Sequence, residues 1–119
     1  MARLLRGAPV AQALTLSLKP RVEALRDRGV VATLAVVRVG EGASDLSYER
    51  AARRRMDTVG IATKSIALSA DCSQVELTDA IDRVNGDAGI HGCLILRPLP
   101  KTLDERAACA ALDVAKDVD

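Results

Sequence analysis

Tyr48 is the residue whose type and position most suggest chemistry, because the 119-residue chain has one Tyr and neither Phe nor Trp. It lies in LSYERAARRR, residues 46–55, shortly before three consecutive arginines. A helix turns about 100° per residue, so Arg55 would share the side of Tyr48 while Arg54 would point away. The segment suggests a ring that faces a ligand, although a Tyr at the domain edge beside solvated arginines also explains it.

Two other segments carry residues that could line a site. VGEGASD, residues 39–45, has two glycines ahead of an expected helix, but it lacks the G-x-G-x-x-G pattern and the GK[ST] ending of phosphate-binding loops. An ordinary tight turn is the simpler explanation. RPLPKT, residues 97–102, contains Pro98 and Pro100, which restrict the backbone and suit either a rigid pocket wall or a plain strand terminator.

The composition indicates one folded domain and argues against several classes of function. Apolar residues make up 49% of the chain, and 17 basic side chains balance 16 acidic ones, so we expect neither disorder nor a general nucleic-acid surface. No apolar stretch approaches the roughly 20 residues that span a bilayer, and the N-terminus has no sustained apolar core. Three scattered cysteines and one His indicate reduced thiols in a cytoplasmic protein without a metal site.

Helical and strand patterns alternate along the chain. SQVE, residues 73–76, is a capping box, and we also expect Asp45 to cap a helix and Thr102 with Glu105 to form a second capping box. We expect a strand to begin at residue 90 and to end before Pro98, because proline has no amide hydrogen to donate to the hydrogen bonds of a sheet. The expected elements are helix 9–28 with an apolar stripe of Val10, Leu14, Leu18, Val22 and Leu25, strand 30–39, helix 46–59, strand 61–68, helix 74–86, strand 90–97, and a last helix to about 112.

Strands joined by helices predict a three-layer α/β/α sandwich with a mostly parallel sheet. In such sheets ligands bind beyond the carboxyl ends of the strands. The loops at 39–45 and 97–102 should emerge at that edge, and the last segment, AKDVD, could return to it. The unusual residues of the chain therefore converge on one place.

Four segments resemble the N-terminal catalytic domain of the bifunctional methylenetetrahydrofolate dehydrogenase/cyclohydrolase family: LAVVRVGEGASDLSYER, VGIATKSIAL, IHGCLILRPLPKTLDE and ALDVAKDVD. They follow the family's order and spacing and cover nearly the whole chain from residue 30. The resemblance implies that residues 1–119 are a folate-binding catalytic domain, which in the family precedes a Rossmann domain that binds NAD(P). This chain contains no dinucleotide fingerprint, so we expect it alone not to oxidise the folate.

The resemblance also assigns roles to individual residues. Tyr48 matches the family's Tyr that stacks on or lines the pterin region, and Asp119, which ends KDVD, matches the Asp that hydrogen-bonds the pterin edge. Part of the pocket wall is matched by Pro98, Leu99 and Pro100, and we add the neighbouring Leu96 and Arg97 as candidate substrate-binding residues. Arg55 is the cation that we place beside Tyr48 as a second catalytic candidate. The family further implies one-carbon metabolism that supplies purine biosynthesis, a cytoplasmic location and a homodimer.

Two departures from the family pattern concern hydrolysis. A Lys four residues after the Tyr usually catalyses the cyclohydrolase step, and this chain has Ala52; the Gln that usually partners it is Leu96. An arginine stays protonated and cannot replace a lysine in proton transfer. We therefore expect oxidation of 5,10-methylenetetrahydrofolate in the full-length protein, with hydrolysis weak or differently catalysed.

Two alternatives remain open from the sequence. The chain can be a non-catalytic folate-binding or regulatory domain derived from the family, because Tyr48 and Asp119 support binding in either case. A related two-domain dehydrogenase acting on another substrate is a weaker alternative. The choice between NAD and NADP depends on residues that this sequence does not contain.

Overall fold

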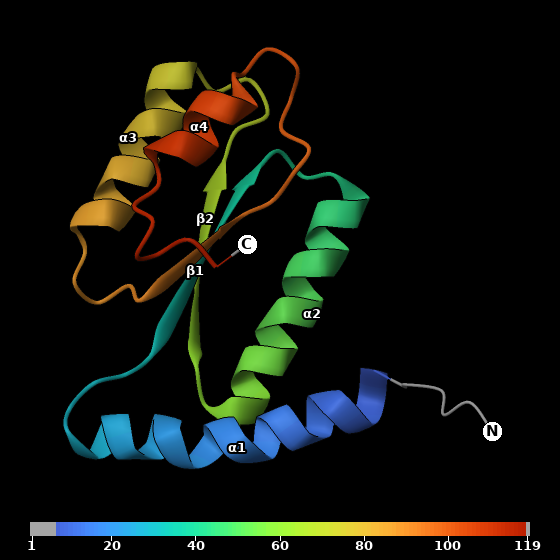
Figure 1. The fold of residues 1–119 in the computed structure, drawn as a ribbon. Helices are drawn as coiled ribbons and strands as arrows, with labels where there is room; N and C mark the ends of the chain where they lie inside the picture. The colour runs from blue at the N-terminus through green and yellow to red at the C-terminus, as the bar shows by residue number, and fades with distance from the viewer. Residues whose placement is uncertain (1–6, 119) are drawn as a thin grey trace.

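The fold alternates helices and strands in the order that the sequence predicts (Figure 1). The computed structural model describes residues 7–118, and Asp119 lies outside that range. No helix within the described range is both long and apolar enough to cross a bilayer. The elements are α1 (Gly7–Asp27), β1 (Thr33–Val39), α2 (Ala43–Val59), β2 (Ala62–Leu68), α3 (Gln74–Gly86), β3 (Gly92–Ile95) and α4 (Glu105–Ala111).

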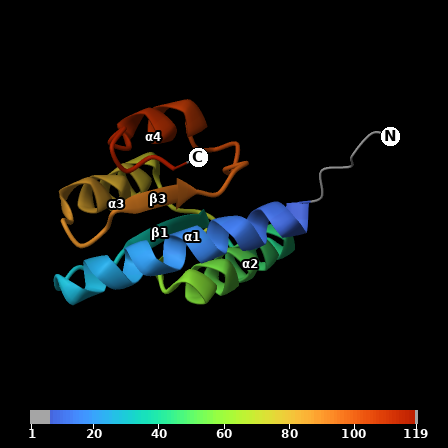
Figure 2. The ribbon, with the colours of Figure 1, turned by 60° about the horizontal axis from the view of Figure 1, so that its bottom comes forward.

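The three strands form a parallel sheet in the order β2-β1-β3. The central strand β1 pairs with β2 from Thr33 opposite Ala62, and with β3 from Leu34 opposite Gly92. The sheet separates two layers of helices, with α3 and α4 on one side and α1 and α2 on the other (Figure 2). The predicted three-layer α/β/α sandwich with a parallel sheet is confirmed.

The main apolar core lies between the sheet and the helices α3 and α4. Successive side chains of a strand point to opposite faces, so alternate residues of β1 enter this core. The apolar stripe of α3 meets them there, as its spacing predicts. The fully buried members from these two elements are Ala35, Val37, Leu77 and Ile81, with Val39 and Val84 almost as buried.

Polar side chains tie α3 to α4 and to the end of the chain. Ser73 forms the predicted capping box with Glu76 at the start of α3. At the other end of the helix, Lys116 donates from Nζ to the carbonyl oxygens of Val84 and Asp87, each at 2.6 Å. Val84 lies in the last turn of α3 and Asp87 is its C-cap, so a cation there both donates hydrogen bonds and interacts favourably with the helix dipole.

The predicted caps of α2 and α4 are wrong. Helix α2 begins at Ala43 with Gly42 as its N-cap, so Asp45 lies inside the first turn instead of capping it. The cap of α4 is Asp104, whose side chain accepts a hydrogen bond from the Ala107 amide at 2.9 Å. Glu105 is the first residue of α4 and not the third, which a capping box requires, and its carboxylate accepts from the amide of Leu99 at 2.8 Å.

The end of β3 and the buried face of α1 also differ from prediction. Strand β3 ends at Ile95, before Pro98, because the ladder to β1 is complete once the Leu96 amide has donated to the Val37 carbonyl at 3.0 Å. Of the apolar stripe expected in α1, Val22 is buried, whereas Leu14 is 57% exposed. The buried side chain lies where α1 meets the end of α2, within contact of Gly60.

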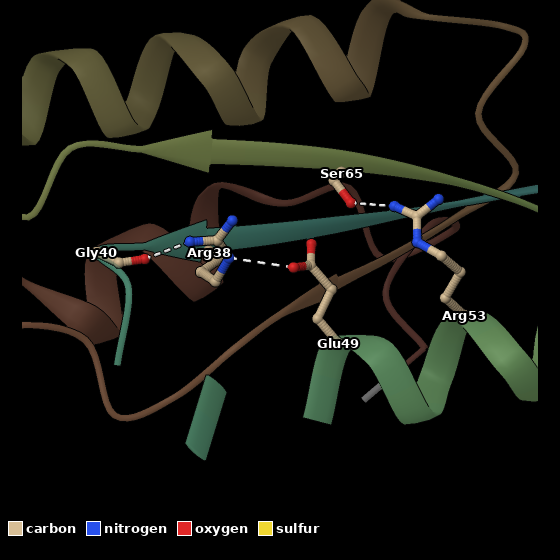
Figure 3. A network of polar contacts seen from close by, with 5 residues as sticks. All are labelled: Arg38, Gly40, Glu49, Arg53 and Ser65. Carbon is tan, nitrogen blue, oxygen red and sulfur yellow. Dashed lines mark hydrogen bonds and ion pairs between the residues drawn. The ribbon is translucent and has the colours of Figure 1, made fainter. Parts of the chain in front are cut away.

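The second face of β1 is covered by α2 and is partly charged (Figure 3). Arg38 points toward α2 and donates from Nε to the Oε2 atom of Glu49 at 3.2 Å and from its terminal nitrogen to the Gly40 carbonyl at 2.6 Å. One turn further along α2, Arg53 donates to the hydroxyl of Ser65 on β2. The ionised side chains of Arg38 and Glu49 are only 11% and 10% exposed, so this ion pair is nearly withdrawn from water.

Replacing Lys116 by Met should lower the free energy of unfolding by about 1.5–3 kcal/mol, the usual contribution of hydrogen bonds to a charged group. The thioether keeps most of the apolar stem but leaves the Val84 and Asp87 carbonyls without their donor. Urea denaturation followed by circular dichroism measures the loss. Lys101→Met at an exposed lysine is the matched control, and equal midpoints for the two variants would contradict the assignment.

Breaking the Arg38–Glu49 pair from one side should cost about 3–5 kcal/mol of stability, because it leaves a buried charge without its partner. Arg38→Leu and Glu49→Leu should each unfold at lower denaturant concentration than the parent. The double variant Arg38→Leu/Glu49→Leu should recover most of the loss, since no buried charge remains. If the two single losses simply add in the double variant, the side chains do not interact energetically.

Candidate functional site

A cavity of about 290 Å³ lies between the start of α2 and the end of β3. One side is lined by Ser44, Asp45 and Tyr48 of α2, and the other by the four consecutive residues from Leu94 to Arg97. This is the edge beyond the carboxyl ends of the strands, where ligands bind in open α/β sheets. Tyr48 is 56% exposed and borders the cavity, so its ring is available to a ligand and takes no part in the core.

The placement of Tyr48 follows from the way α2 begins. Gly40 turns the chain out of β1 with a φ of 83°, a left-handed conformation that favours glycine, and a Cβ there would lie 3.3 Å from the Cβ of Ala70. Asp45 and Tyr48 are three residues apart on the helix and share a face. Glu49, the next residue, turns inward to Arg38 and holds that part of α2 against the sheet.

A second cavity, of about 270 Å³, adjoins the first through a shared wall of Ile95 and Arg97. Its remaining lining is formed by Cys109 and Leu112 from the region of α4 and by Asp117 near the end of the chain. Arg97 therefore borders both cavities. The two spaces together run along the end of β3, from the helix that carries Tyr48 to the segment that carries Asp117.

The end of the chain returns to the sheet, as the sequence analysis expected. Asp117 forms an isolated parallel bridge with Cys93, whose amide donates to the Lys116 carbonyl at 2.6 Å. The amide of Val118 in turn donates to the Cys93 carbonyl at 3.4 Å. The KDV segment thus runs beside β3 toward the cavities. Asp119, the predicted contact of the pterin edge, lies outside the described residues.

The predicted site residues do not all meet in these cavities. Leu96 and Arg97 lie with Tyr48 at the first cavity. Pro98, Leu99 and Pro100 line neither of the two cavities; Leu99 is only 7% exposed and belongs to the core under α4. Arg55 is exposed on α2 and lines neither cavity.

Asp45 is a cavity residue that sequence reasoning assigned to another role. Its spacing of three from Tyr48 was the signal that could have placed it beside the ring, but its position ahead of an apolar-periodic segment favoured a cap. The two departures from the family pattern take no part in proton transfer. Ala52 is a half-buried methyl group, and Leu96 presents an apolar side chain to the cavity.

The surroundings of Cys72, Cys93 and His91 indicate structural roles. Cys72, Cys93 and Cys109 form no disulfide with one another. Burial raises the pKa of the Cys93 thiol to about 11, with a further contribution from the nearby charge of Asp117, so the thiol stays protonated and unreactive at neutral pH. Burial likewise raises the pKa of Cys72. His91 accepts a hydrogen bond from the Thr33 amide through Nδ1 at 3.2 Å and borders neither cavity of the site.

The sequence is similar to those of known proteins along its whole length. The "Bifunctional protein FolD" of Alkaliphilus oremlandii is 39% identical over 119 residues, which are 100% of this chain and 42% of that protein. The protein of the same name from Clostridioides difficile is 39% identical over 117 residues, or 98% of this chain and 41% of its own. The chain thus spans less than half the length of the curated relatives that it matches.

Solved structures share the fold. A 5,10-methylenetetrahydrofolate dehydrogenase from the silkworm Bombyx mori superimposes with a TM-score of 0.92 at 29% identity, over 100% of this chain and 41% of that one. A methylenetetrahydrofolate dehydrogenase-cyclohydrolase from Trypanosoma brucei, complexed with NADP cofactor and inhibitor, gives 0.91 at 28% identity, over 99% of this chain and 40% of its own.

The family model described as "Tetrahydrofolate dehydrogenase/cyclohydrolase, catalytic domain" matches residues 5–119. That range includes the residues that line both cavities and the segment that returns beside β3. Because the match covers nearly the whole chain, the protein belongs to the tetrahydrofolate dehydrogenase/cyclohydrolase family.

Proposed function

We propose that this chain is the folate-binding catalytic domain of an enzyme of one-carbon metabolism. In the full-length protein it would oxidise 5,10-methylenetetrahydrofolate to 5,10-methenyltetrahydrofolate with NAD(P)+. The observation that carries the proposal is the cavity in which Tyr48, the single aromatic residue of the chain, faces the end of β3 within the family's catalytic-domain fold. A cytoplasmic homodimer is the form that we propose for the full-length protein, on the family resemblance alone.

The residues of this chain would act mainly by holding the folate in position. The ring of Tyr48 offers a flat apolar face against which a pterin or p-aminobenzoate ring stacks, with Leu94 and Leu96 as the opposite apolar wall. Asp119 would accept hydrogen bonds from the parallel donors of the pterin edge, a geometry that suits a carboxylate. Fixing the ring system at both ends presents the one-carbon group in one orientation, and orientation supplies much of a transfer reaction's acceleration.

The loop that precedes α2 does not fit the pyrophosphate of a dinucleotide. Gly42 is exposed, but Gly40 is buried, Glu41 is exposed between them and Asp45 lies in the first helical turn. Two carboxylates at this helix N-terminus would repel a phosphate that the amide groups would otherwise attract. NAD(P) would accept the hydride from a site formed by other residues of the full-length protein.

A non-catalytic folate-binding domain is the second candidate. The observation in its favour is that Ala52 and Leu96 replace the proton-transferring pair that the family resemblance led us to expect. The two candidates agree on folate binding and differ only in turnover. An assay of full-length protein for NAD(P)+ reduction by methylenetetrahydrofolate separates them, because reduction supports the enzyme and its absence with intact folate binding supports the binding domain.

Binding of a folate analogue should quench the fluorescence of Tyr48, which is the only fluorescent side chain of the 119-residue chain. Tyr48→Ala should weaken the affinity, measured by calorimetry, by about tenfold, because ring stacking and the area it buries contribute about 1–1.5 kcal/mol. Arg55→Gln is the matched control on the same helix and should bind normally. Unchanged affinity in Tyr48→Ala would remove the ring from the site.

Asp119→Ala should also weaken folate binding, by tenfold or more, because a charged acceptor contributes about 1.5–3 kcal/mol to its hydrogen bonds. Asp113→Ala, which removes a carboxylate that instead holds the turn after α4, is the comparison. Calorimetric titration of both variants with the same analogue measures the difference. Equal affinity in Asp119→Ala and the parent would contradict a folate site that extends to the end of KDVD.

A further inference from the structure

Asp45 places an unengaged carboxylate at the Tyr48 cavity. The residue lies in the first turn of α2, is partly buried, and lines the cavity together with Tyr48 and Arg97. Its carboxylate makes no hydrogen bond or ion pair with any residue of the described range 7–118. It is not needed as a helix cap, because Gly42 occupies that position. A carboxylate that borders a ligand cavity without a structural partner is available for chemistry.

The other residues around the cavity do not offer the same chemistry at neutral pH. Leu94, Ile95 and Leu96 are apolar. Arg97 stays protonated and can only stabilise charge. Ser44 and Tyr48 offer hydroxyl groups, which need a neighbouring base to activate them. Asp45 is therefore the one side chain of the described cavity lining whose ordinary ionised form accepts a proton.

We propose that Asp45 is the general base of a hydrolytic step at this site, in which water opens a methenyltetrahydrofolate to the formyl derivative. The inference rests on the proposed function, since it assigns the proton transfer for a folate bound beside Tyr48. It gives the domain a route to hydrolysis that uses neither an amine at position 52 nor an amide at position 96.

The step balances without a further reactant. The water oxygen bonds to the methenyl carbon, its proton passes to the Asp45 carboxylate, and the electron pair of the carbon–nitrogen double bond returns to nitrogen. The Asp45 carboxyl group then gives that proton to N5 as the carbon–N5 bond breaks. The added hydroxyl group releases its own proton to solvent and becomes the formyl carbonyl. One water is consumed, one proton is released, and Asp45 ends as a carboxylate.

Charge also suits this assignment. The methenyl group is cationic, so a carboxylate beside it attracts the substrate as well as the proton of the attacking water. Asp45 lies in the first turn of α2, where the helix dipole interacts favourably with an acidic side chain. Arg97, on the opposite wall, can stabilise the oxygen that gains electron density as the carbonyl forms.

Asp45→Asn tests the proposal directly because it keeps the size of the side chain and removes the accepting charge. The loss of methenyltetrahydrofolate absorbance in the near ultraviolet, corrected for the rate in buffer, measures hydrolysis by the 119-residue chain. We expect the rate of hydrolysis to fall 100-fold or more, which is the lower range of general-base effects. The affinity for folic acid, whose ring system is uncharged, should change by no more than twofold. Asp45→Glu should restore part of the rate, and the acidic limb of the parent's pH–rate profile should vanish in Asp45→Asn.

Asp57→Asn is the matched control, because it changes an exposed aspartate on the same helix away from the cavity. Asp45→Ser, which suits the first turn of a helix, repeats the test if the Asn variant proves unstable by circular dichroism. Normal hydrolysis by Asp45→Asn or by Asp45→Ser overturns the proposal, and so does a parent chain that binds folate without accelerating hydrolysis. A parent chain that binds no folate overturns the proposed function instead.

Discussion

The ion pair between Arg38 and Glu49 is the contact on which the geometry of the site depends. It joins the carboxyl end of the central strand to the second turn of α2, and Arg38 also holds the Gly40 carbonyl at the turn between them. A buried ion pair adds little net stability compared with apolar side chains of similar size. It does require one particular rotation of the helix, and that rotation places Tyr48 on the outer face.

The two faces of the sheet contribute differently to the protein. Toward α3 and α4 the contacts are apolar, and the terminal KDV segment is secured on that side by Lys116 at the end of α3. Toward α2 the contacts include charges and hydroxyl groups. The site lies at the end of β3, where the apolar and the polar contacts of the sheet meet. One wall comes from a helix positioned by charged contacts and the other from a strand positioned by apolar packing.

The Tyr48 cavity combines an aromatic ring with apolar side chains, and the chain lacks the Lys and Gln pair that the family resemblance led us to expect. Leu96 adds an apolar side chain to its lining, while Asp45 and Arg97 bring one negative and one positive charge to opposite walls. Such a lining favours a flat ring system that carries a localised charge. The role that we propose for Asp45 would place proton transfer in the first turn of α2 instead of in its middle.

The sequence by itself determined the class of fold, because periodicities of two and 3.6 residues reflect local backbone geometry that survives in any packing. It also singled out Tyr48, because an isolated aromatic residue is visible in the composition. Only the tertiary structure decided that Leu99 enters the core, that Glu49 is buried and that Asp45 borders the cavity. Each of these outcomes depends on how α2 and the loop after β3 are rotated against the sheet, and contacts between residues distant in sequence set that rotation.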